Sequence, residues 1–329
     1  MRIAVDGYGG DNAPAEVVKG VLAALEADKE VEILLTGKAE ELCALAGEHD
    51  RLTIRDAREV ISCDETPTVA IRTKKGSSLV VALDAVKEGE ADGLVSAGST
   101  GAVLVGATLK IGRIRGVERP ALAPALPTVK GGNVILCDCG ANVDCKPAYL
   151  VNFARMAVAY QKGVFGIENP SVGLLNNGAE ETKGNAFSVE CYGLLKEAQG
   201  INFVGNVEAR DILSGDCDVV VADGFDGNIA LKSAEGTANA VFALLKENIY
   251  NGGLRAKCGA LMLKPVFKKL KHTLDYNEHG GAAFLGLKKP VVKAHGSSKS
   301  KSVCGAILQV RDMIVGEVSE RLEKDIQND

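Results

Sequence analysis

Six short segments rich in glycine and polar residues interrupt the chain, most of them after an apolar run typical of a β-strand. In open parallel α/β sheets, ligands bind beyond the carboxyl ends of the strands. Glycine there lets the backbone approach a ligand closely, and a helix that begins just afterwards aims free N–H groups at an anion. The sequence therefore predicts an α/β enzyme with an anion-binding cleft. The six segments are Asp6–Asn12, Ser96–Gly101, Asp138–Asn142, Asn176–Gly178, Asp223–Asn228 and His295–Ser300.

The segment that begins at His295 carries residue types suited to phosphate. It follows a predicted strand and precedes a predicted helix, so Ser297, Ser298 and backbone N–H groups would surround an anion. His295 and Lys299 flank this loop, and His295 is the histidine best placed for acid–base work. The spacing G-x-x-x-x-G-K-[ST] of a Walker A loop is missing. The alternative interpretation is a serine-capped helix.

Two further segments extend this hypothesis. Ser96, Ser99 and Thr100 have the same strand-to-helix context and form a second candidate cradle for an anion or an oxyanion. Lys183 stands near a predicted helix start, where a buried cation would hold phosphate or neutralise an oxyanion in a transition state. A solvated surface lysine is the alternative.

The first polar segment begins like a dinucleotide-binding fingerprint. Asp6–Gly10 starts the pattern G-x-G-x-x-G after a predicted strand, but Asn12 takes the third glycine position. The other interpretations are a turn that binds a different anion and a turn that only tightens packing.

The nine cysteines include no C-x-x-C pair. An odd number of cysteines in a chain of this length indicates reduced thiols. Cys139 and Cys304 lie near polar segments and are the candidates for a nucleophilic thiol, although free cysteine is also a common small core residue. The spacing of Cys137, Cys139 and Cys145 is not that of a zinc site, so we predict neither a metal nor a cofactor.

The composition places the chain among ordinary globular proteins. Its 329 residues are 46% hydrophobic and 25% charged. A net charge of −5, with no tryptophan, argues against nucleic-acid binding, which needs a basic surface and stacking platforms. The start lacks the long apolar region of a signal peptide, so a cytoplasmic location is expected. Without a linker or repeat, residues 1–329 read as a single two-lobed catalytic unit.

The elements that must position these segments alternate between strand and helix. This βαβαβ order predicts a parallel sheet with right-handed crossovers. The expected strands are Ile3–Asp6, Glu32–Thr36, Leu52–Arg55, Gly93–Ser96, Leu122–Pro127, Val134–Asp138, Val172–Leu175, Phe203–Val207, Val219–Ala222 and Val291–Ala294. The expected helices are one after Asp11–Pro14, with Asn12 or Ala13 near its cap, then Lys38–Ala46, Ser77–Glu88, Thr100–Ile111, Pro147–Gln161, Lys183–Ala198, Asn228–Leu270 interrupted at Asn251–Gly253 and at Pro265, and Lys301–Arg321.

A basic amphipathic segment is expected to protrude at about residues 240–275. Apolar residues recur there at helical spacing, with lysines between them. Such a helical pair suits an anionic membrane surface, an acidic carrier protein, or packing in a dimer. The apolar positions are Leu254, Cys258, Leu261, Met262, Val266, Leu270 and Leu274, and the basic ones are Lys257, Lys264, Lys268, Lys269 and Lys271.

Taken together, these segments resemble the bacterial phosphate acyltransferases of phospholipid synthesis. The resemblance covers essentially the whole chain, and several long matches in the right order are more specific than any one motif. Departures from the family pattern are Gly7-Tyr8 in the first segment, Gly76 in place of an aspartate and Cys139 in place of a valine. The matching segments are Gly9–Pro14, Arg72–Lys75, Ser77–Val81, Ser96–Ala102, Gly140–Asn142, Asp223–Asn228, Asp275–Ala282 and Lys293–Ser298.

The resemblance implies a dimeric, doubly wound αβα sandwich similar to isopropylmalate dehydrogenases and phosphotransacetylases. It implies transfer of a long-chain acyl group from acyl carrier protein to inorganic phosphate, with peripheral contact to an anionic membrane and to the downstream membrane acyltransferase. In the implied site, Ser297, Ser298 and the Ser96–Thr100 loop hold phosphate, Lys183 faces the developing charge, and His295 orients phosphate or shuttles its proton. Further substrate-binding residues are expected at Asp6, Gly9, Gly10, Asn12, Asn142, Asn177, Asp223 and Asn228.

Three other interpretations share part of this pattern. A phosphotransacetylase that uses an acyl-coenzyme A has the same fold and differs in its thioester. A nicotinamide-dependent decarboxylating dehydrogenase needs a trio of aspartates for a metal, of which only Asp223 and Asp226 are adjacent. A non-catalytic regulator that binds acyl carrier protein would show no turnover.

Overall fold

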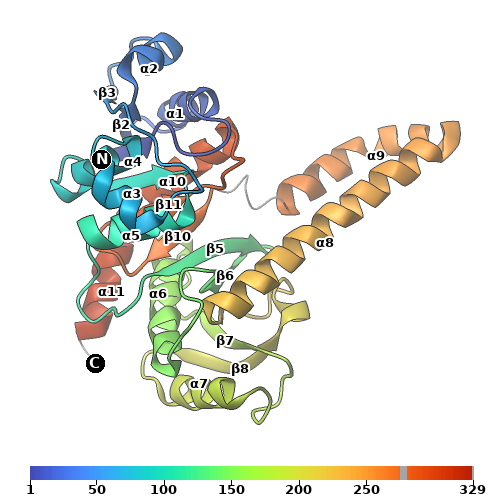
Figure 1. Ribbon diagram of the computed structural model, residues 1–329. Coiled ribbons are helices and arrows are strands. Elements are labelled where there is room, and N and C mark those ends of the chain that lie inside the picture. The colour runs from blue at the N-terminus through green and yellow to red at the C-terminus, as the bar shows by residue number, and fades with distance from the viewer. Residues whose placement is uncertain (275–279, 328–329) are drawn as a thin grey trace.

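The computed structural model describes residues 1–274 and 280–327. Its centre is an 11-stranded sheet in the order β3-β2-β1-β4-β11-β10-β5-β6-β9-β7-β8. Helices cover both faces (Figure 1). The fold is thus the α/β sandwich predicted from the alternating pattern. The expected residues Asp275–His279 of the family pattern lie outside the described part of the chain.

The first half of the sheet is parallel apart from one strand. Strands β1 to β4 and β11 run in the same direction, and β10 pairs antiparallel with both β11 and β5. Helices α1, α2 and α10 pack on one face, while α4 and α5 pack on the other. The bounds are β1 Arg2–Asp6, α1 Ala15–Ala27, β2 Glu32–Gly37, α2 Ala39–Ala46, β3 Leu52–Asp56, α3 Pro67–Thr73, α4 Ser78–Lys87, β4 Gly93–Ser96, α5 Thr100–Lys110, β10 Ala282–Leu285, β11 Val291–Lys293, α10 Ser300–Val315 and α11 Val318–Gln327.

The second half continues from β5 and carries the middle of the chain. Strand β5 pairs antiparallel with β6, and β6, β9, β7 and β8 are parallel. Helices α6 and α7 cover one face, and the start of α8 covers the other. The bounds are β5 Ala121–Pro127, β6 Asn133–Cys137, α6 Pro147–Phe165, β7 Ser171–Asn176, α7 Ala186–Glu197, β8 Asn202–Glu208, η1 Ala209–Asp211, β9 Val219–Val221, α8 Gly224–Asn251 and α9 Gly253–Leu274.

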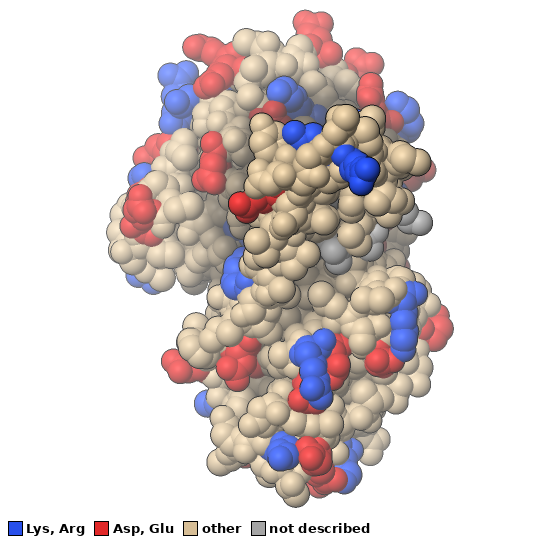
Figure 2. Space-filling view, turned by 90° about the vertical axis from the view of Figure 1, so that its right-hand side faces the viewer, with Lys and Arg blue, Asp and Glu red and all other residues tan. Residues whose placement is uncertain are grey.

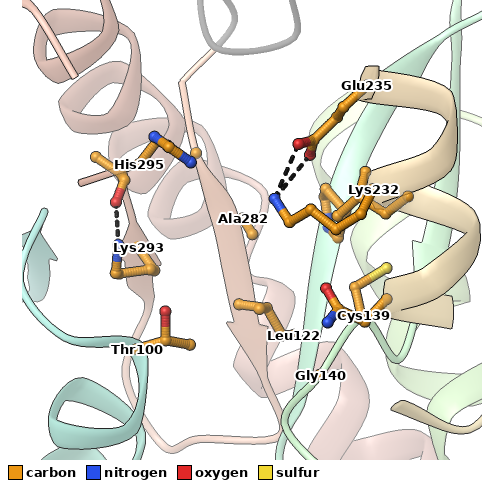
Figure 3. A pocket seen from close by; sticks show the side chains of 14 residues that line it. Thr100, Leu122, Cys139, Gly140, Lys232, Glu235, Ala282, Lys293 and His295 are labelled. Carbon is orange, nitrogen blue, oxygen red and sulfur yellow. Dashed lines mark hydrogen bonds and ion pairs between the residues drawn. The ribbon is translucent and has the colours of Figure 1, made fainter. Parts of the chain in front are cut away.

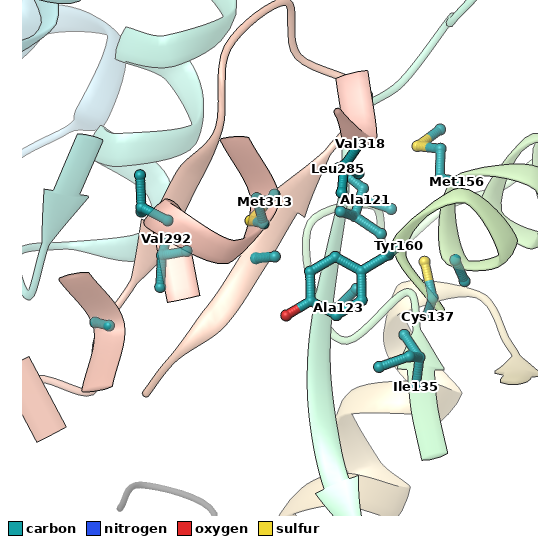
Figure 4. Close-up of a cluster of buried hydrophobic side chains, with 14 of the residues drawn as sticks. Ala121, Ala123, Ile135, Cys137, Met156, Tyr160, Leu285, Val292, Met313 and Val318 are labelled. Atoms are coloured by element: carbon teal, nitrogen blue, oxygen red, sulfur yellow. The ribbon is translucent and has the colours of Figure 1, made fainter. Parts of the chain in front are cut away.

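One hydrophobic core joins the two halves. Figure 4 shows side chains from β5, β6 and α6 beside others from β10, β11 and α10. Tyr160 of α6 is buried there, and its hydroxyl accepts a hydrogen bond of 2.9 Å from Gln309 Nε2 of α10. The oxygen of the same Gln309 amide accepts from the backbone N–H of Gly281. The junction is therefore packed with apolar groups and satisfied in its polar ones.

The end of α8 and all of α9 project from the body as an antiparallel hairpin (Figure 1). The part of its surface that Figure 2 draws in colour is mostly uncharged, with basic groups among the other residues. Leu261 and Met262 are 70% and 82% exposed. Within the described ranges, no helix is both long enough and apolar enough to cross a bilayer.

Several predicted boundaries are wrong. Helix α1 begins only at Ala15, because the Asn12 side chain donates to the carbonyls of Ser297 and Ser298 and caps nothing. Helix α9 continues through Pro265. The closing helix is two helices, since Glu317 takes a left-handed backbone conformation with φ of 51°. The short α3 and β10 were not predicted.

Candidate active site

A cavity of about 260 Å³ lies where the two halves of the sheet meet (Figure 3). Strand β11 supplies Lys293 and leads into His295, and α8 supplies Asn228 and Lys232. Helix α5 begins at Thr100 in the cavity wall, so its first turn brings unpaired N–H groups to this point. Of the predicted site residues, the fold thus brings Thr100, Asn228 and His295 together.

Two lysines and one carboxylate line this cavity, Lys293, Lys232 and Glu235, so its net charge is positive. Lys293 is only 8% exposed, and burial lowers the pKa of its ammonium to about 8. Its Nζ donates to the carbonyl of Ala294. Lys232 pairs with Glu235 one turn along α8 at 2.9 Å, with Lys232 itself half-exposed. At neutral pH the buried ammonium is still charged, and an anion in the cavity would offset the cost of burying it.

His295 enters the cavity from the loop after β11. Its Nδ1 accepts a hydrogen bond of 3.2 Å from the Ser297 backbone N–H and lies 2.8 Å from Ser297 Oγ. Because Nδ1 accepts, the proton of the neutral ring belongs on Nε2. Burial, then the charges of Lys232 and Lys293, lower the pKa of His295, so the ring is neutral at pH 7. A neutral imidazole with Nε2–H is a hydrogen-bond donor to an anion.

The first two polar segments meet beside this cavity at the ends of neighbouring strands. Ser96 Oγ, at the end of β4, donates to Asp6 Oδ2, at the end of β1, over 2.7 Å, and both residues are buried. Burial raises the pKa of Asp6. A Cβ on Gly9 would lie 2.6 Å from the backbone N of Gly98, so only glycine permits this approach. Gly10 lies against the His295 loop, since the next residue, Asp11, donates its N–H to the Gly296 carbonyl.

The predicted phosphate loop at the start of α10 is already engaged. The backbone N–H of Ser300 donates to the Glu16 carboxylate over 2.9 Å. Ser297 supports His295, and Ser298 is buried with its hydroxyl unpaired among the described residues. Neither serine lines the cavity, and Ser99 stands at its edge as the residue before α5. The Glu16 carboxylate at the start of α10 would repel a second anion at that helix end.

Two residues predicted to bind substrate, Asn142 and Asp223, instead make hydrogen bonds within the protein. The Asn142 side chain donates to the Pro120 carbonyl at 2.8 Å and to the Asp138 carboxylate at 3.0 Å. Asp223 is the N-cap of α8 and accepts from the N–H groups of Phe225 and Asp226. Both residues therefore fix the loops that carry Gly140 and Asn228 to the cavity wall.

Lys183 and Asn177 lie apart from this cavity. Lys183 is exposed in the loop before α7, which begins only at Ala186 because Asn185 forms a capping box with Ser188. Asn177 lines a second, larger cavity, together with Gly184, the neighbour of Lys183. The fold thus separates these two residues from the histidine with which the sequence grouped them.

Of the two candidate nucleophilic cysteines, Cys139 is buried and Cys304 is partly buried. Cys139 borders the small cavity, but burial, then the Asp138 charge, raise the pKa of its thiol well above the usual range. Burial also raises the pKa of Cys304. Both thiols are therefore protonated at neutral pH and are poor nucleophiles.

Sequence reasoning missed Lys293 and Lys232. A signal for Lys293 was present, because it is the one charged residue in an apolar strand that ends at a polar segment. Lys232 stands four residues after Asn228, which puts both on one face of α8.

The fold and the cavity define the class of protein, an α/β enzyme of the phosphotransacetylase fold with a cationic cavity between its halves. A branched-chain phosphotransacylase from Enterococcus faecalis aligns with a TM-score of 0.62 at 14% identity, over 95% of this chain and 99% of that one. A phosphotransacetylase from Streptococcus pyogenes gives 0.61 at 18% identity, over 95% and 94%.

The sequence comparison then shows the family. The chain belongs to the family described as fatty acid synthesis protein, whose model matches residues 1–321. A phosphate acyltransferase from Bacillus licheniformis is 48% identical over 327 residues, 99% of this chain and 98% of the relative. One from Bacillus cereus is 50% identical over 318 residues, 97% and 96%. The protein is therefore a transferase.

Proposed function

We propose that this protein transfers a long-chain acyl group from the thioester of an acyl carrier protein to inorganic phosphate. The observation that carries the proposal is the small cavity, where the buried Lys293 meets His295 and the first turn of α5 at Thr100. A small dianion suits these groups, because cations and helix N-termini both stabilise it. The phosphate acyltransferase name of relatives at about half identity supports the choice of acceptor.

The reaction needs no nucleophile from the protein. A phosphate oxygen attacks the thioester carbonyl carbon and forms a C–O bond, and the resulting oxyanion collapses with cleavage of the C–S bond. The sulfur leaves with the bonding electrons and takes the proton of hydrogen phosphate, which gives a thiol and an acyl phosphate. A thiol pKa of about 8.5 makes it a good leaving group. The protein must position phosphate and stabilise the oxyanion.

The site residues divide these tasks. Lys293 and the N–H groups of α5 at Thr100 hold phosphate, and His295 donates from Nε2 to orient it. Asn228 and Lys232, on the opposite wall, face the carbonyl as its charge develops. Asp6, Ser96, Gly9 and Gly10 keep the strand ends in place, as Asn142 and Asp223 do for the other wall.

A role for Lys183 is still proposed from the resemblance, but at the larger cavity and not beside His295. Its loop borders the larger cavity, so Lys183 would meet the carrier protein of the donor and not the bound phosphate. We expect Lys183→Ala to raise the KM for the acyl donor and to leave the KM for phosphate within about twofold. Near-normal turnover at all donor concentrations would remove Lys183 from the mechanism.

The proposal also includes a membrane surface and a second copy of the chain as partners. The exposed apolar residues of the α8–α9 hairpin suit peripheral contact with an anionic membrane, where the acyl phosphate would be used by a membrane acyltransferase. A homodimer in the cytoplasm is the assembly that the resemblance favours.

The test is phosphate-dependent loss of the thioester of acyl-acyl carrier protein, with acyl phosphate trapped by hydroxylamine. Acyl-coenzyme A at the same concentration is the rival donor. Turnover with the carrier-bound donor, abolished without phosphate, is the expected result. Turnover only with the coenzyme would make the protein a phosphotransacetylase, and no turnover with either would leave a binding or regulatory role.

A further inference from the structure

A second, larger cavity lies against α8 on the outer face of the second half-sheet. Its volume is about 890 Å³, within the range of about 300–1,000 Å³ typical of ligand pockets. The sheet side of its wall is apolar, with Leu126 from β5, Leu136 from β6 and Leu175 from β7. Ile212 and Leu213, which follow η1, close a further side.

The helix side of the wall leaves room between α8 and the sheet. Ala230, Ala234 and Ala238 line it and recur every four residues, which puts them on one face of α8. Protein interiors are normally close-packed, and large aliphatic side chains at these positions would fill the gap. Short side chains opposite leucines keep an apolar space open.

The two cavities occupy adjoining faces of the same helix. Asn228 and Lys232 line the small cavity, while Ala230 and Ala234 line the larger one, and Leu231 lines both. Successive residues of a helix lie about 100° apart around its axis. A molecule with its polar end in the small cavity would therefore enter the larger one by passing Leu231.

We propose that the larger cavity holds the alkyl chain of the acyl donor, while the donor's carbonyl lies at the small cavity. This inference rests on the proposed function, which supplies a donor with one polar end and a long apolar chain. The shared border of the two cavities at Leu231 and the leucine wall argue for that occupant. Charged residues in the lining are Arg210, which is paired with Glu208, and Asp226.

The unmodified protein gives the first test. Carrier-protein donors with hexanoyl, octanoyl, decanoyl and palmitoyl chains would be compared by kcat/KM at saturating phosphate. Burial of each added methylene should raise kcat/KM by about fourfold until the cavity is filled. Equal values for hexanoyl and decanoyl donors would overturn the proposal.

A substitution that fills the larger cavity gives the second test. Ala234→Phe should lower the ratio of kcat/KM for palmitoyl over hexanoyl donors at least tenfold, through loss with palmitoyl alone. Hexanoyl turnover should persist, because the small cavity is untouched. Ala240→Phe is the matched control, since Ala240 is exposed on the same helix and is not a lining residue of either cavity. If Ala234→Phe does not fold, as judged by circular dichroism, Ala238→Phe takes its place.

The remaining outcomes separate the rival explanations. An unchanged ratio in Ala234→Phe overturns the proposal, and a change in oligomeric state by light scattering would then assign this face to a second copy of the chain. If the unmodified protein uses none of the carrier-bound donors, the proposed function fails. Binding of cis-parinaric acid, a fluorescent fatty acid, then tests whether the larger cavity holds an alkyl chain. Saturable binding that Ala234→Phe abolishes would support an alkyl-chain site, and absence of binding would exclude one.

Discussion

At the scale of single residues, burial of Lys293 governs the chemistry of the site. Its side chain is 8% exposed, and its pKa falls to about 8 because water is excluded from the ammonium. The charge is complete below that pH and is lost as pH rises through it. A buried cation attracts an anion more strongly than an exposed lysine such as Lys183 does, because less water screens the two charges.

Phosphate binding should therefore weaken in alkaline solution. Above about pH 8.5 phosphate is almost entirely the dianion, so over that range its KM should rise by up to about tenfold per pH unit as Lys293 loses its charge. Lys293→Met should raise this KM about ten- to hundredfold at pH 7.5, the value of a charged hydrogen bond, and abolish the alkaline rise. A variant that keeps the same alkaline rise would show that another group titrates.

The same lysine should lower the stability of the fold at neutral pH. In the unfolded chain its pKa returns to near 10.5, so unfolding takes up a proton between about pH 8 and 10.5 and stability rises with pH over that window. Lys293→Met should raise the free energy of unfolding in urea at pH 7 by up to about 3 kcal/mol. The exposed Lys288→Met is the control and should stay within about 0.5 kcal/mol. Destabilisation by Lys293→Met would mean that its hydrogen bond to Ala294 outweighs the burial cost.

At the scale of elements, α8 is the part on which the site depends. Its N-terminal turns are held against the end of β6 by close backbone contact, and its faces line both cavities. Gly227 makes that contact possible, since a Cβ there would lie 2.0 Å from the Asp138 carbonyl oxygen. Further along, the helix leaves the body and joins α9 in the hairpin of Figure 1.

Alanine substitutions at two glycines of α8, Gly227 and Gly236, distinguish the effect of close packing from the effect of helix propensity. Gly227→Ala should push α8 from β6, lower stability by about 1–3 kcal/mol and reduce turnover at least tenfold through displacement of Asn228. Gly236→Ala has no atom within 4 Å of the new methyl group and should stabilise the protein by up to about 1 kcal/mol with activity kept. Thermal unfolding and turnover of both variants check this, and a harmless Gly227→Ala would contradict the contact.

The hairpin should bind anionic lipid through its exposed apolar side chains. Leu261→Asp with Met262→Asp should reduce flotation with phosphatidylglycerol vesicles at least tenfold. Each change removes an exposed apolar side chain that would enter the lipid and adds a charge of the same sign as the lipid headgroups. Val129→Asp, at a site 86% exposed in the β5–β6 turn, is the control. Unchanged flotation together with a higher KM for the carrier-bound donor would assign the hairpin to the carrier protein.

At the scale of the whole molecule, the halves share one sheet and one core. Strand β5 pairs with β10 of the first half and β6 of the second, and the cluster of Figure 4 crosses the junction. The site lies at this junction, so its geometry depends on how firmly the halves are joined. The polar link from Tyr160 to Gln309 is buried within it.

Both halves should therefore unfold together. Urea unfolding followed by near-ultraviolet and far-ultraviolet circular dichroism should give one coincident transition. Tyr160→Phe should leave Gln309 Nε2 unpaired and lower stability by about 1–3 kcal/mol without splitting the transition. Two separated transitions in the unmodified protein would show two domains and would contradict the single two-lobed unit that we predict.

The sequence by itself determined the elements and the polar segments between them. Alternating apolar runs and turn residues are local signals, so strands such as Gly93–Ser96 and helices such as Pro147–Phe165 could be predicted closely. His295, Thr100 and Asn228 could be proposed for the same reason, since each follows a strand end or opens a helix. The tertiary structure decided which segments meet.

That decision depends on distant pairing, which local patterns do not encode. The unpredicted β10 inserts antiparallel between β11 and β5, so the end of the chain meets its middle. Pairing of β11 with β4 and β10 buries Lys293, and packing of α10 against α1 brings Glu16 to the start of α10. The same fold separates Lys183 from His295. Burial and charge neighbours set the chemistry of a side chain, and both arise from packing between residues far apart in sequence.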